Sequence, residues 1–307
     1  MSDRTDTCAS APAIELDGVE KSYPYFQLQD VRMRLAPGEV MGFIGPNGAG
    51  KSTTIRILMG FVRQDRGEVR VLGHPIPAEQ AAAKRQIGYV SEEMRLFGQA
   101  TLKWHMDFVA SSYPGWDVQY AKTLLRRLDL RPEQAARQLS HGQHMKAMLL
   151  LALARRPRLL VLDEPMTGLD PVARHEMLAE LMEVLTDDSR SVLFSSHHTQ
   201  DVEQISDQIT FIDRGRIIES SDKETFLDRW RRLHLELPPG AQLPPRRGVI
   251  DVKNGGGRLS VVTTNAFTPE LGAAYEQAGA RIREIQHMTL EEIFVAEVMA
   301  SRQERVA

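Results

Sequence analysis

One stretch of nine residues matches the pattern G-x-x-x-x-G-K-[ST] at every fixed position. It consists of Gly45, Pro46, Asn47, Gly48, Ala49, Gly50, Lys51, Ser52 and Thr53. The glycines allow a tight turn that directs backbone N–H groups at phosphate oxygens. We therefore predict a loop that binds a nucleoside triphosphate, with Lys51 on the β- and γ-phosphates and Ser52 on Mg²⁺. A glycine-rich turn without a ligand would need no lysine and serine at these two places.

The neighbours of this loop have the patterns that such a site requires. Residues 40–44 form an apolar run with the length of a buried strand, and residues 54–59 begin a helix. The N-terminal end of a helix adds positive potential next to a bound anion. Strand, loop and helix together favour phosphate binding over a simple turn.

The composition is that of a soluble protein. Of the 307 residues, 42% are hydrophobic and 26% charged, and the net charge is −3, so we expect no nucleic-acid partner. Cys8 is the single cysteine and cannot form an internal disulfide, which fits a reducing compartment. No signal peptide opens the chain, and no apolar run approaches the roughly 20 residues that span a bilayer. We expect a cytoplasmic protein, with any membrane-spanning part in another chain.

Alternating strand and helix patterns predict an α/β domain over residues 13–235. Two antiparallel strands, 14–23 and 26–35, are expected to meet at Pro24. Apolar residues at helical spacing predict a helical insertion over residues 98–157. Further strands are expected at 40–44, 67–73, 87–90, 159–162, 191–195, 209–212 and 217–218, and further helices at 78–85, 171–185 and 199–205. Apolar strands between helices predict a mostly parallel sheet that is covered on both faces.

The ends of the chain have a different character. Residues 1–12 are polar without periodicity and are expected to form a flexible tail. A Pro-rich stretch over 235–247 is typical of a linker, and residues 236–307 are expected to form a small accessory α+β domain without catalytic motifs. Its expected elements are a hairpin of 249–252 and 258–263 turning at 254–257, a helix at 269–278, a strand at 281–285 and a helix from 290. The basic cluster at 229–232 is interpreted as a solvated helix face, in preference to a contact with lipid or nucleic acid.

Three further motifs resemble those of the ATP-binding-cassette (ABC) ATPases, in the order that this family requires. Residues 139–143 (Leu-Ser-His-Gly-Gln) resemble the signature L-S-G-G-Q, Asp163 and Glu164 close an apolar strand as a Walker B motif does, and His197 resembles the switch histidine. The resemblance covers residues 14 to about 220. It implies a P-loop NTPase fold with a RecA-like core, an antiparallel β subdomain and an inserted helical subdomain. It also implies that ATP and Mg²⁺ are the cofactors.

The residue types fit ATP hydrolysis, which needs an aligned water, a base and cations over the γ-phosphate. Asp163 is expected to position Mg²⁺ through water, and Glu164 to act as the base or to orient the water. His197 can bond the γ-phosphate and hold that base, and Lys51 completes the catalytic set. The alternative for the acidic pair is a helix N-cap.

By resemblance, other residues act on ATP from outside the loop. Ser140, Gly142 and Gln143 are expected to close over the γ-phosphate in the opposite subunit of a dimer that holds two ATP molecules. Asp170 is expected to lie at the dimer seam. Tyr23 matches the aromatic residue that stacks on adenine, although packing is the alternative for this ring and for its neighbours Tyr25 and Phe26.

Two positions depart from the family pattern. Glu92 stands where a glutamine that senses Mg²⁺ and the γ-phosphate is usual, and a carboxylate there can still bind the metal. His141 replaces a glycine in the signature, so its side chain must point away from the phosphates or donate to them. A metal site at His141 and His144 is disfavoured, because no cysteine or acidic residue completes it.

The resemblance implies an ATPase subunit that dimerises with itself or a paralogue and drives a separate membrane permease, and we expect an exporter. The permease's cytoplasmic helix would dock beside Glu92, in a groove shared with residues 97–104. The subunit would then lie at the inner face of the cell membrane. The alternative is a soluble ABC ATPase that acts on ribosomes or DNA, but such relatives usually carry two cassettes, coiled coils or zinc-binding cysteine pairs.

Overall fold

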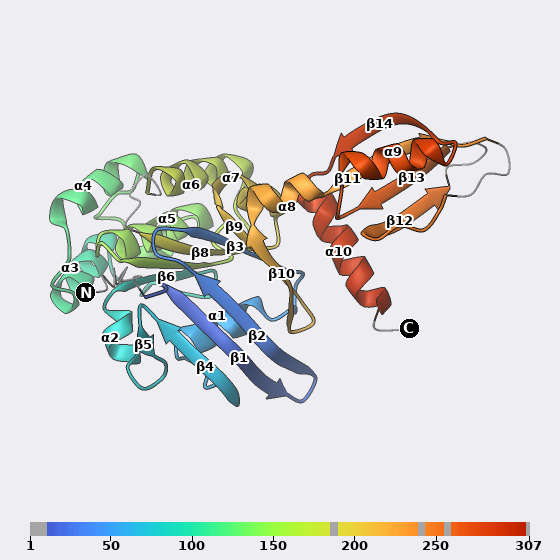
Figure 1. Ribbon diagram of the computed structural model, residues 1–307. Coiled ribbons are helices and arrows are strands. Elements are labelled where there is room, and N and C mark those ends of the chain that lie inside the picture. Colours follow the sequence, from blue (N-terminus) through green and yellow to red (C-terminus); the bar gives the residue numbers. More distant parts are fainter. Residues whose placement is uncertain (1–10, 185–189, 239–242, 255–258, 305–307) are drawn as a thin grey trace, which may run out of the picture.

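The computed structural model describes residues 11–184, 190–238, 243–254 and 259–304, which form three β-sheets with helices around them (Figure 1). Most of the predicted tail and the hairpin turn after Asn254 lie outside these residues. The first sheet has the strand order β2-β1-β4-β5. Its strands are β1 (Ile14–Tyr23), β2 (Phe26–Leu35), β4 (Arg66–Val71) and β5 (His74–Pro75). The predicted antiparallel pair of β1 and β2 is confirmed to the residue.

The second sheet forms the centre of the molecule, with the order β10-β9-β3-β8-β7-β6. Its strands are β3 (Val40–Ile44), β6 (Ile87–Ser91), β7 (Leu159–Asp163), β8 (Ser191–Ser196), β9 (Gln208–Asp213) and β10 (Arg216–Asp222). All neighbours pair in parallel except β9 and β10. This confirms the mostly parallel sheet that the sequence predicts.

Alternate residues of the central strands serve different cores, because successive side chains of a strand point to opposite faces. On β7, Leu159 and Val161 pack with the first sheet and α1 (Lys51–Leu58). Leu160 and Leu162 pack on the other face, against α5 (His141–Leu153). With both faces buried, the strand reads as a continuous apolar run.

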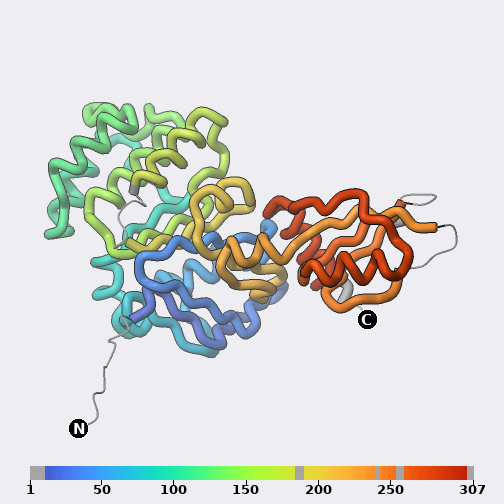
Figure 2. Tube along the Cα trace, turned by 45° about the horizontal axis from the view of Figure 1, so that its top comes forward, coloured from blue at the N-terminus to red at the C-terminus, as the bar shows by residue number. Residues whose placement is uncertain are grey.

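The predicted helical insertion is confirmed as three helices and a short 3₁₀ turn. They are α3 (Leu102–Ser112), α4 (Val118–Arg127), the turn Ala136–Gln138 and α5. The remaining helices of the α/β part are α2 (Gln80–Lys84), α6 (Pro171–Val184) and α7 (Thr199–Ile205). In both views, the insertion (green) and the third sheet (orange and red) lie at opposite ends of the molecule (Figures 1 and 2).

The third sheet, of order β12-β13-β11-β14, corrects the expected linker. Its strands are β11 (Arg231–Glu236), β12 (Val249–Asn254), β13 (Leu259–Thr264) and β14 (Arg281–His287), and α9 (Pro269–Gln277) packs with it. Strand β11 pairs with both β13 and β14, so this sheet begins upstream of residue 235. The Pro-rich segment therefore joins two strands of one sheet rather than two domains.

The basic cluster is also not a solvated helix face. After α8 (Lys223–Arg229), the Trp230 side chain is fully buried and Arg231 is buried at the start of β11. The Arg231 guanidinium donates to the Leu227 carbonyl at 3.1 Å. Long arginine stems can line apolar surface while the head finds a hydrogen-bond acceptor, and charge counting alone cannot detect this arrangement.

The last helix, α10 (Leu290–Glu304), leaves the third sheet and packs on the central domain. Leu290 and Ile293 belong to the same buried cluster as Phe211 on β9 and Trp230. The accessory region therefore has a hydrophobic cluster of its own on the third sheet and is joined to the α/β core through α10.

Candidate active site

The carboxyl ends of the central strands bring the predicted catalytic residues together. Ile44, the last residue before the glycine-rich loop, pairs in register with Ser196 on β8. Asp163 at the end of β7 lies between Ser91 and Ser195 on the neighbouring strands. Because parallel strands end at the same edge, residues far apart in sequence meet above the loop.

The loop has the backbone shape that its glycines predict. Gly50 caps α1 with a left-handed φ of 114°, and a side chain there would collide with Phe26 and Leu28 of β2. The Lys51 side chain is buried, and its Nζ donates to the Gly45 carbonyl at 2.6 Å. The loop therefore wraps around its own lysine, with the α1 N-terminus facing the open side.

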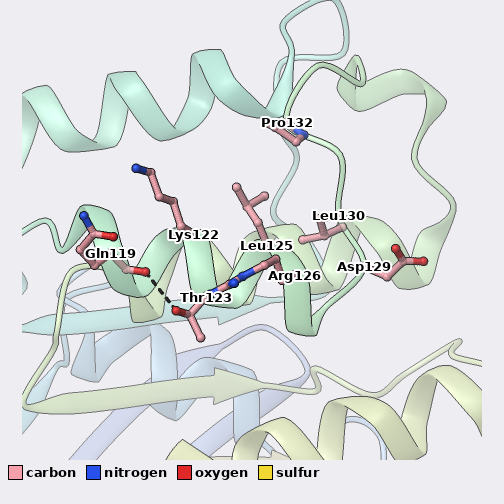
Figure 3. A pocket seen from close by; sticks show the side chains of 8 residues that line it. All are labelled: Gln119, Lys122, Thr123, Leu125, Arg126, Asp129, Leu130 and Pro132. Carbon is pink, nitrogen blue, oxygen red and sulfur yellow. Dashed lines mark hydrogen bonds between the residues drawn. The ribbon is translucent and has the colours of Figure 1, made fainter.

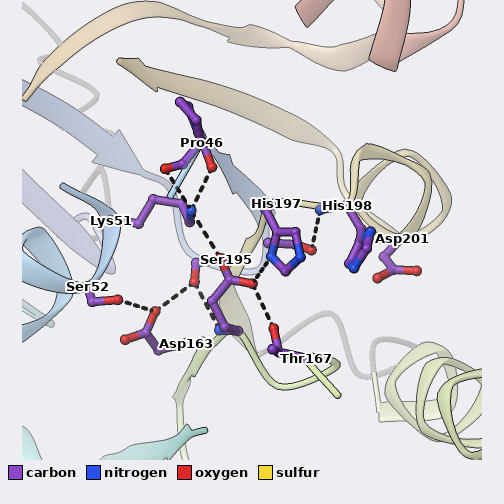
Figure 4. A network of polar contacts seen from close by, with 12 residues as sticks. Pro46, Lys51, Ser52, Asp163, Thr167, Ser195, His197, His198 and Asp201 are labelled. Carbon is purple, nitrogen blue, oxygen red and sulfur yellow. Dashed lines mark hydrogen bonds and ion pairs between the residues drawn. The ribbon is translucent and has the colours of Figure 1, made fainter. Parts of the chain in front are cut away.

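Glu164 contacts three side chains at once, those of Lys51, Thr167 and His197, which Figure 4 labels. One carboxylate oxygen, Oε1, lies 3.0 Å from Lys51 Nζ. The other, Oε2, accepts hydrogen bonds from His197 Nδ1 at 2.6 Å and from Thr167 Oγ1 at 3.1 Å. Since a carboxylate only accepts, Nδ1 of His197 carries the proton, and Nε2 is the ring nitrogen left to meet a phosphate. Sequence reasoning missed the role of Thr167, although it lies three residues after Glu164.

The Glu164 backbone is held in a left-handed conformation with φ 53°, which is uncommon for a residue with a side chain. Its N–H points at the Ser195 hydroxyl, 3.1 Å away. Burial raises the pKa of Glu164, but Lys51 and His197 outweigh burial, so the pKa is lowered overall. The carboxylate is thus ionised and fixed in direction, as a base that aligns a water must be.

Asp163 forms a second group of oxygen atoms beside the loop. Its Oδ1 accepts from Ser195 Oγ at 2.8 Å and from Ser52 Oγ at 3.3 Å. Burial raises the pKa of Asp163, because a carboxylate is costly to ionise away from water, and this effect outweighs the hydrogen bonds from Ser195 and Ser52. A hydroxyl and a carboxylate are hard oxygen ligands of the kind that Mg²⁺ prefers. These residues therefore fit the predicted metal.

A pocket of about 550 Å³ opens over these groups and holds most of the residues predicted to bind nucleotide. It is lined by Phe26, Pro46, Asn47, Gly48, Gly50, Lys51, Ser52, Thr53, Glu92, Glu164, Thr167 and His197. Glu92 thus lies at the site, and its N–H donates to the Asp163 carbonyl at 3.3 Å. The lining aromatic is Phe26, while Tyr23 is 42% exposed with its ring centroid 6.5 Å away from that of Phe26.

The signature residues line no part of this pocket. Ser140 caps α5 in a reciprocal box: its hydroxyl accepts from Gln143 N–H, and the Gln143 amide accepts from Ser140 N–H. Gly142 lies close to Ala173, where an added Cβ would be 3.2 Å from the alanine methyl. Within one chain, these residues are therefore placed away from the loop whose phosphates they would touch.

His141 turns toward its own chain. Its Nε2 lies 2.9 Å from the Thr167 carbonyl, so this nitrogen donates. The ring also limits the space at Gly168, where φ is 73°. Asp170 follows, and its carboxylate accepts from the N–H groups of Val172 and Ala173 at the start of α6. The extra side chain in the signature thus links it to the segment that leads from Glu164 to Asp170.

A larger hollow of about 810 Å³ lies elsewhere, on the helical insertion (Figure 3). Gln119, Lys122, Leu125 and Arg126 line one side of it. It contains none of the residues predicted for chemistry. We assign the active site by its chemistry and not by its volume.

Residues 11–184 and the later described segments hold no group of three His, Cys, Asp or Glu side chains placed to bind a metal. In the same part of the chain, no helix has both the length and the apolar character needed to cross a membrane.

Comparison with known proteins identifies the family. Residues 28–167 match a family model described as ABC transporter. The chain is 27% identical over 290 residues to the ABC transporter ATP-binding protein YtrB of Bacillus subtilis (strain 168), covering 94% of this chain and 99% of YtrB. It is 32% identical over 232 residues to the Nod factor export ATP-binding protein I of Rhizobium etli, covering 73% of each.

Solved structures agree with these sequence matches. An ATP-binding subunit of an ABC transporter aligns with a TM-score of 0.64 at 28% identity, covering 70% of this chain and 92% of that chain. A dimeric ATP-binding cassette bound to ADP and Pi shares the fold, with a TM-score of 0.61 at 22% identity over 68% of this chain and 98% of that one. The phosphate loop faces an ordered carboxylate, and the chain is similar to known transport ATPases. The protein belongs to the ATP-binding subunits of ABC transporters, which hydrolyse ATP to drive transport.

Proposed function

We propose that this subunit binds MgATP in the pocket above the glycine-rich loop, with Glu164 as the residue that aligns the attacking water. The observation that carries this proposal is the double anchoring of Glu164 by Lys51 on one oxygen and by His197 and Thr167 on the other. A base whose Oε2 is held by two donors keeps a defined direction even when Lys51 leaves Oε1, and in-line attack on a γ-phosphate requires such a direction.

Lys51 suggests how nucleotide binding prepares the site. Its Nζ is paired with Glu164 Oε1 at 3.0 Å, and both side chains are largely buried. Phosphate oxygens that reach Lys51 compete with this carboxylate for the same cation. Binding of ATP would therefore move Lys51 onto the phosphates and release Oε1 to hold a water, while His197 and Thr167 keep Oε2 in place.

Ser52 and Asp163 would hold Mg²⁺, which neutralises charge on the phosphates when it is bound. Glu92 lies at the same pocket and supplies a further oxygen. Its negative charge beside a triphosphate is tolerable only with a cation between them. Phe26 and Tyr23, at the β1–β2 turn, are the two rings available to stack on the base, and Phe26 is the one that lines the pocket.

The second subunit would complete the site. Ser140, Gly142 and Gln143 lie outside the pocket of their own chain, which suits a role on the ATP of a partner. The similar cassette that was solved as a dimer with ADP and Pi supports this arrangement. We propose a dimer that closes around two ATP molecules, formed by two copies of this chain or by one copy and a paralogue, with Asp170 near the seam.

The permease would dock next to Glu92, on an exposed aromatic patch formed by Phe97, Trp104 and Phe108. These side chains are 66%, 45% and 53% exposed, and Trp104 stacks on Phe108 at 5.3 Å between ring centroids. His105 Nε2 accepts from the Phe97 N–H at 3.0 Å and fixes the start of the patch. Large exposed apolar side chains at one place are typical of a protein interface.

Export is the direction that the relatives favour, because several of them are named as Nod factor export proteins. The subunit would work at the inner face of the cell membrane, held there by its permease. The transported compound is selected by the permease, so no residue described above identifies it.

The proposal is tested by steady-state phosphate release from Glu164→Gln. We expect ATP binding and ATP-dependent dimerisation to persist while hydrolysis falls by orders of magnitude. Glu93→Gln is the matched control, since Glu93 is exposed and paired with Arg56 on the surface. Near-normal turnover in Glu164→Gln would show that another group orients the water.

A further inference from the structure

The last helix, α10, is fastened at its N-terminal end to the third sheet. Thr289 and Glu292 form a reciprocal cap: the Thr289 hydroxyl accepts from Glu292 N–H at 3.3 Å, and the Glu292 carboxylate accepts from Thr289 N–H at 3.0 Å. The same carboxylate binds Arg232 on β11 at 2.8 Å. The beginning of α10 therefore follows any movement of this sheet.

The middle and the end of the same helix are fastened to the central domain. Phe294 packs edge-on against Phe211 of β9, with 5.2 Å between ring centroids. Arg302 donates two hydrogen bonds to Asp213, from Nη2 to Oδ1 at 2.9 Å and from Nε to Oδ2 at 3.2 Å. The Asp213 side chain is only 1% exposed, so this forked pair is buried on the carboxylate side.

Asp213 leads directly to the phosphate loop. Two residues later, the Gly215 N–H donates to the Ala49 carbonyl at 2.9 Å, and the Gly215 carbonyl accepts from Gln29 N–H on β2 at 2.8 Å. Gly215 has φ 76°, and a side chain there would lie 1.9 Å from the Gln27 carbonyl oxygen. The turn at Gly215 thus lies between β2 and the loop, in contact with both. A shift of Asp213 must therefore move Gly215, the hydrogen-bond partner of Ala49.

Phe211 supplies a parallel connection. It pairs in register with Ile44, the last strand residue before the loop. Phe294 and Arg302 are eight residues apart, which is about 12 Å along a helix at 1.5 Å per residue. The helix therefore contacts β9 where it runs beside β3 and again at the turn that touches the loop.

From these contacts we propose that α10 positions the phosphate loop, with Arg302 acting on Ala49 through Asp213 and Gly215. Arg302 is a positioning residue and touches no part of the pocket. The contact between Arg302 and Asp213 then influences how well the loop binds ATP, and ATP binding must in return influence how firmly the end of α10 is held. This inference rests on the proposed ATP site at the loop.

Point substitutions in the full chain are the suitable test. A truncation before β12 would remove both strands that pair with β11 and uncover Phe211, so loss of binding would have no single cause. Arg302→Met keeps most of the apolar stem and removes the fork, and Arg302→Lys keeps the charge without the fork. Arg232→Met is the matched control, because it breaks an ion pair of the same helix that stays within the accessory sheet.

ATP affinity is measured with EDTA present, so that hydrolysis does not intervene, and turnover is measured separately with Mg²⁺. We expect Arg302→Met to weaken ATP binding about tenfold while turnover at saturating ATP changes less than twofold. Arg302→Lys should fall between Arg302→Met and the wild type, and Arg232→Met should match the wild type. Hydrogen exchange in the last turn of α10 should slow when ATP is added to the wild type and respond less in Arg302→Met.

Wild-type affinity in Arg302→Met, or an equal loss in Arg232→Met, would overturn the inference. If Arg302→Met fails to fold, the exchange measurement on the wild type decides: protection of α10 that ATP leaves unchanged refutes the link. A wild-type chain that does not bind ATP would instead refute the proposed function, and this inference with it.

Discussion

Replacing Glu164 by Gln has a consequence for stability and binding besides the loss of hydrolysis. The substitution removes the negative charge that faces Lys51 at 3.0 Å, in a pair whose side chains are 6% and 14% exposed. The Lys51 cation is then buried without a counter-charge until phosphates arrive. We therefore expect the variant to be less stable without nucleotide and to bind ATP more tightly.

The size of both effects follows from the same pair. Removing one partner of a buried ion pair costs about 3–5 kcal/mol. The Gln amide oxygen can still accept from Lys51, and a hydrogen bond to a charged group returns about 1.5–3 kcal/mol. The net loss is about 2 kcal/mol, which lowers the melting temperature by about 4–8 °C for a domain of this size. Bound ATP gives Lys51 a counter-charge again and so restores this free energy. The affinity of the variant for ATP should therefore rise about 10- to 30-fold, since 1.4 kcal/mol is a factor of ten.

The assay combines thermal unfolding with equilibrium binding of ATP in EDTA, where neither protein hydrolyses the nucleotide. Glu164→Gln should melt below the wild type without ATP and gain more from saturating ATP. Glu93→Gln, which removes an exposed carboxylate, should match the wild type in both measurements. An unchanged melting temperature together with unchanged affinity would refute the view that Lys51 exchanges a carboxylate for phosphate.

Three other outcomes are expected. Lys51→Ala should abolish tight ATP binding in the same assay, because the loop loses its one buried cation; retained affinity would place the phosphates elsewhere. Burial raises the pKa of Asp163 in the folded state. The protonated carboxyl therefore contributes to the free energy of unfolding at pH values below the unfolded-state pKa, and this contribution is lost as the pH rises through the folded-state pKa. Mg²⁺ needs the carboxylate, so more Mg²⁺ should be required for half-maximal hydrolysis at mildly acidic than at neutral pH; equal requirements would exclude Asp163 as a ligand. Glu92→Ala should lower permease-stimulated hydrolysis more than basal hydrolysis, whereas equal losses would confine Glu92 to the chemistry.

The order of elements was largely predictable because each is encoded locally. Strands β1, β2 and β3 occupy the predicted residues, since alternation and apolar runs depend only on near neighbours. Strand β11 was missed because prolines shortly after it suggested a linker, although Leu233 and Leu235 alternate with polar residues. Its two partners, β13 and β14, lie further along the chain, so only the folded sheet shows where it belongs.

By itself, the sequence determined which residues could perform chemistry: a loop with Lys51 and Ser52, an acidic pair at a strand end, and His197 after another strand. Residue type and short spacing carry that information. Only the tertiary structure decided their contacts, such as Lys51 with Glu164 and His141 with Thr167. These partners lie 26 to 113 residues apart, and their meeting depends on how sheets and helices pack. The link from Arg302 to the phosphate loop is of the same kind, because the sequence around Arg302 does not indicate that this residue contacts a turn beside the loop.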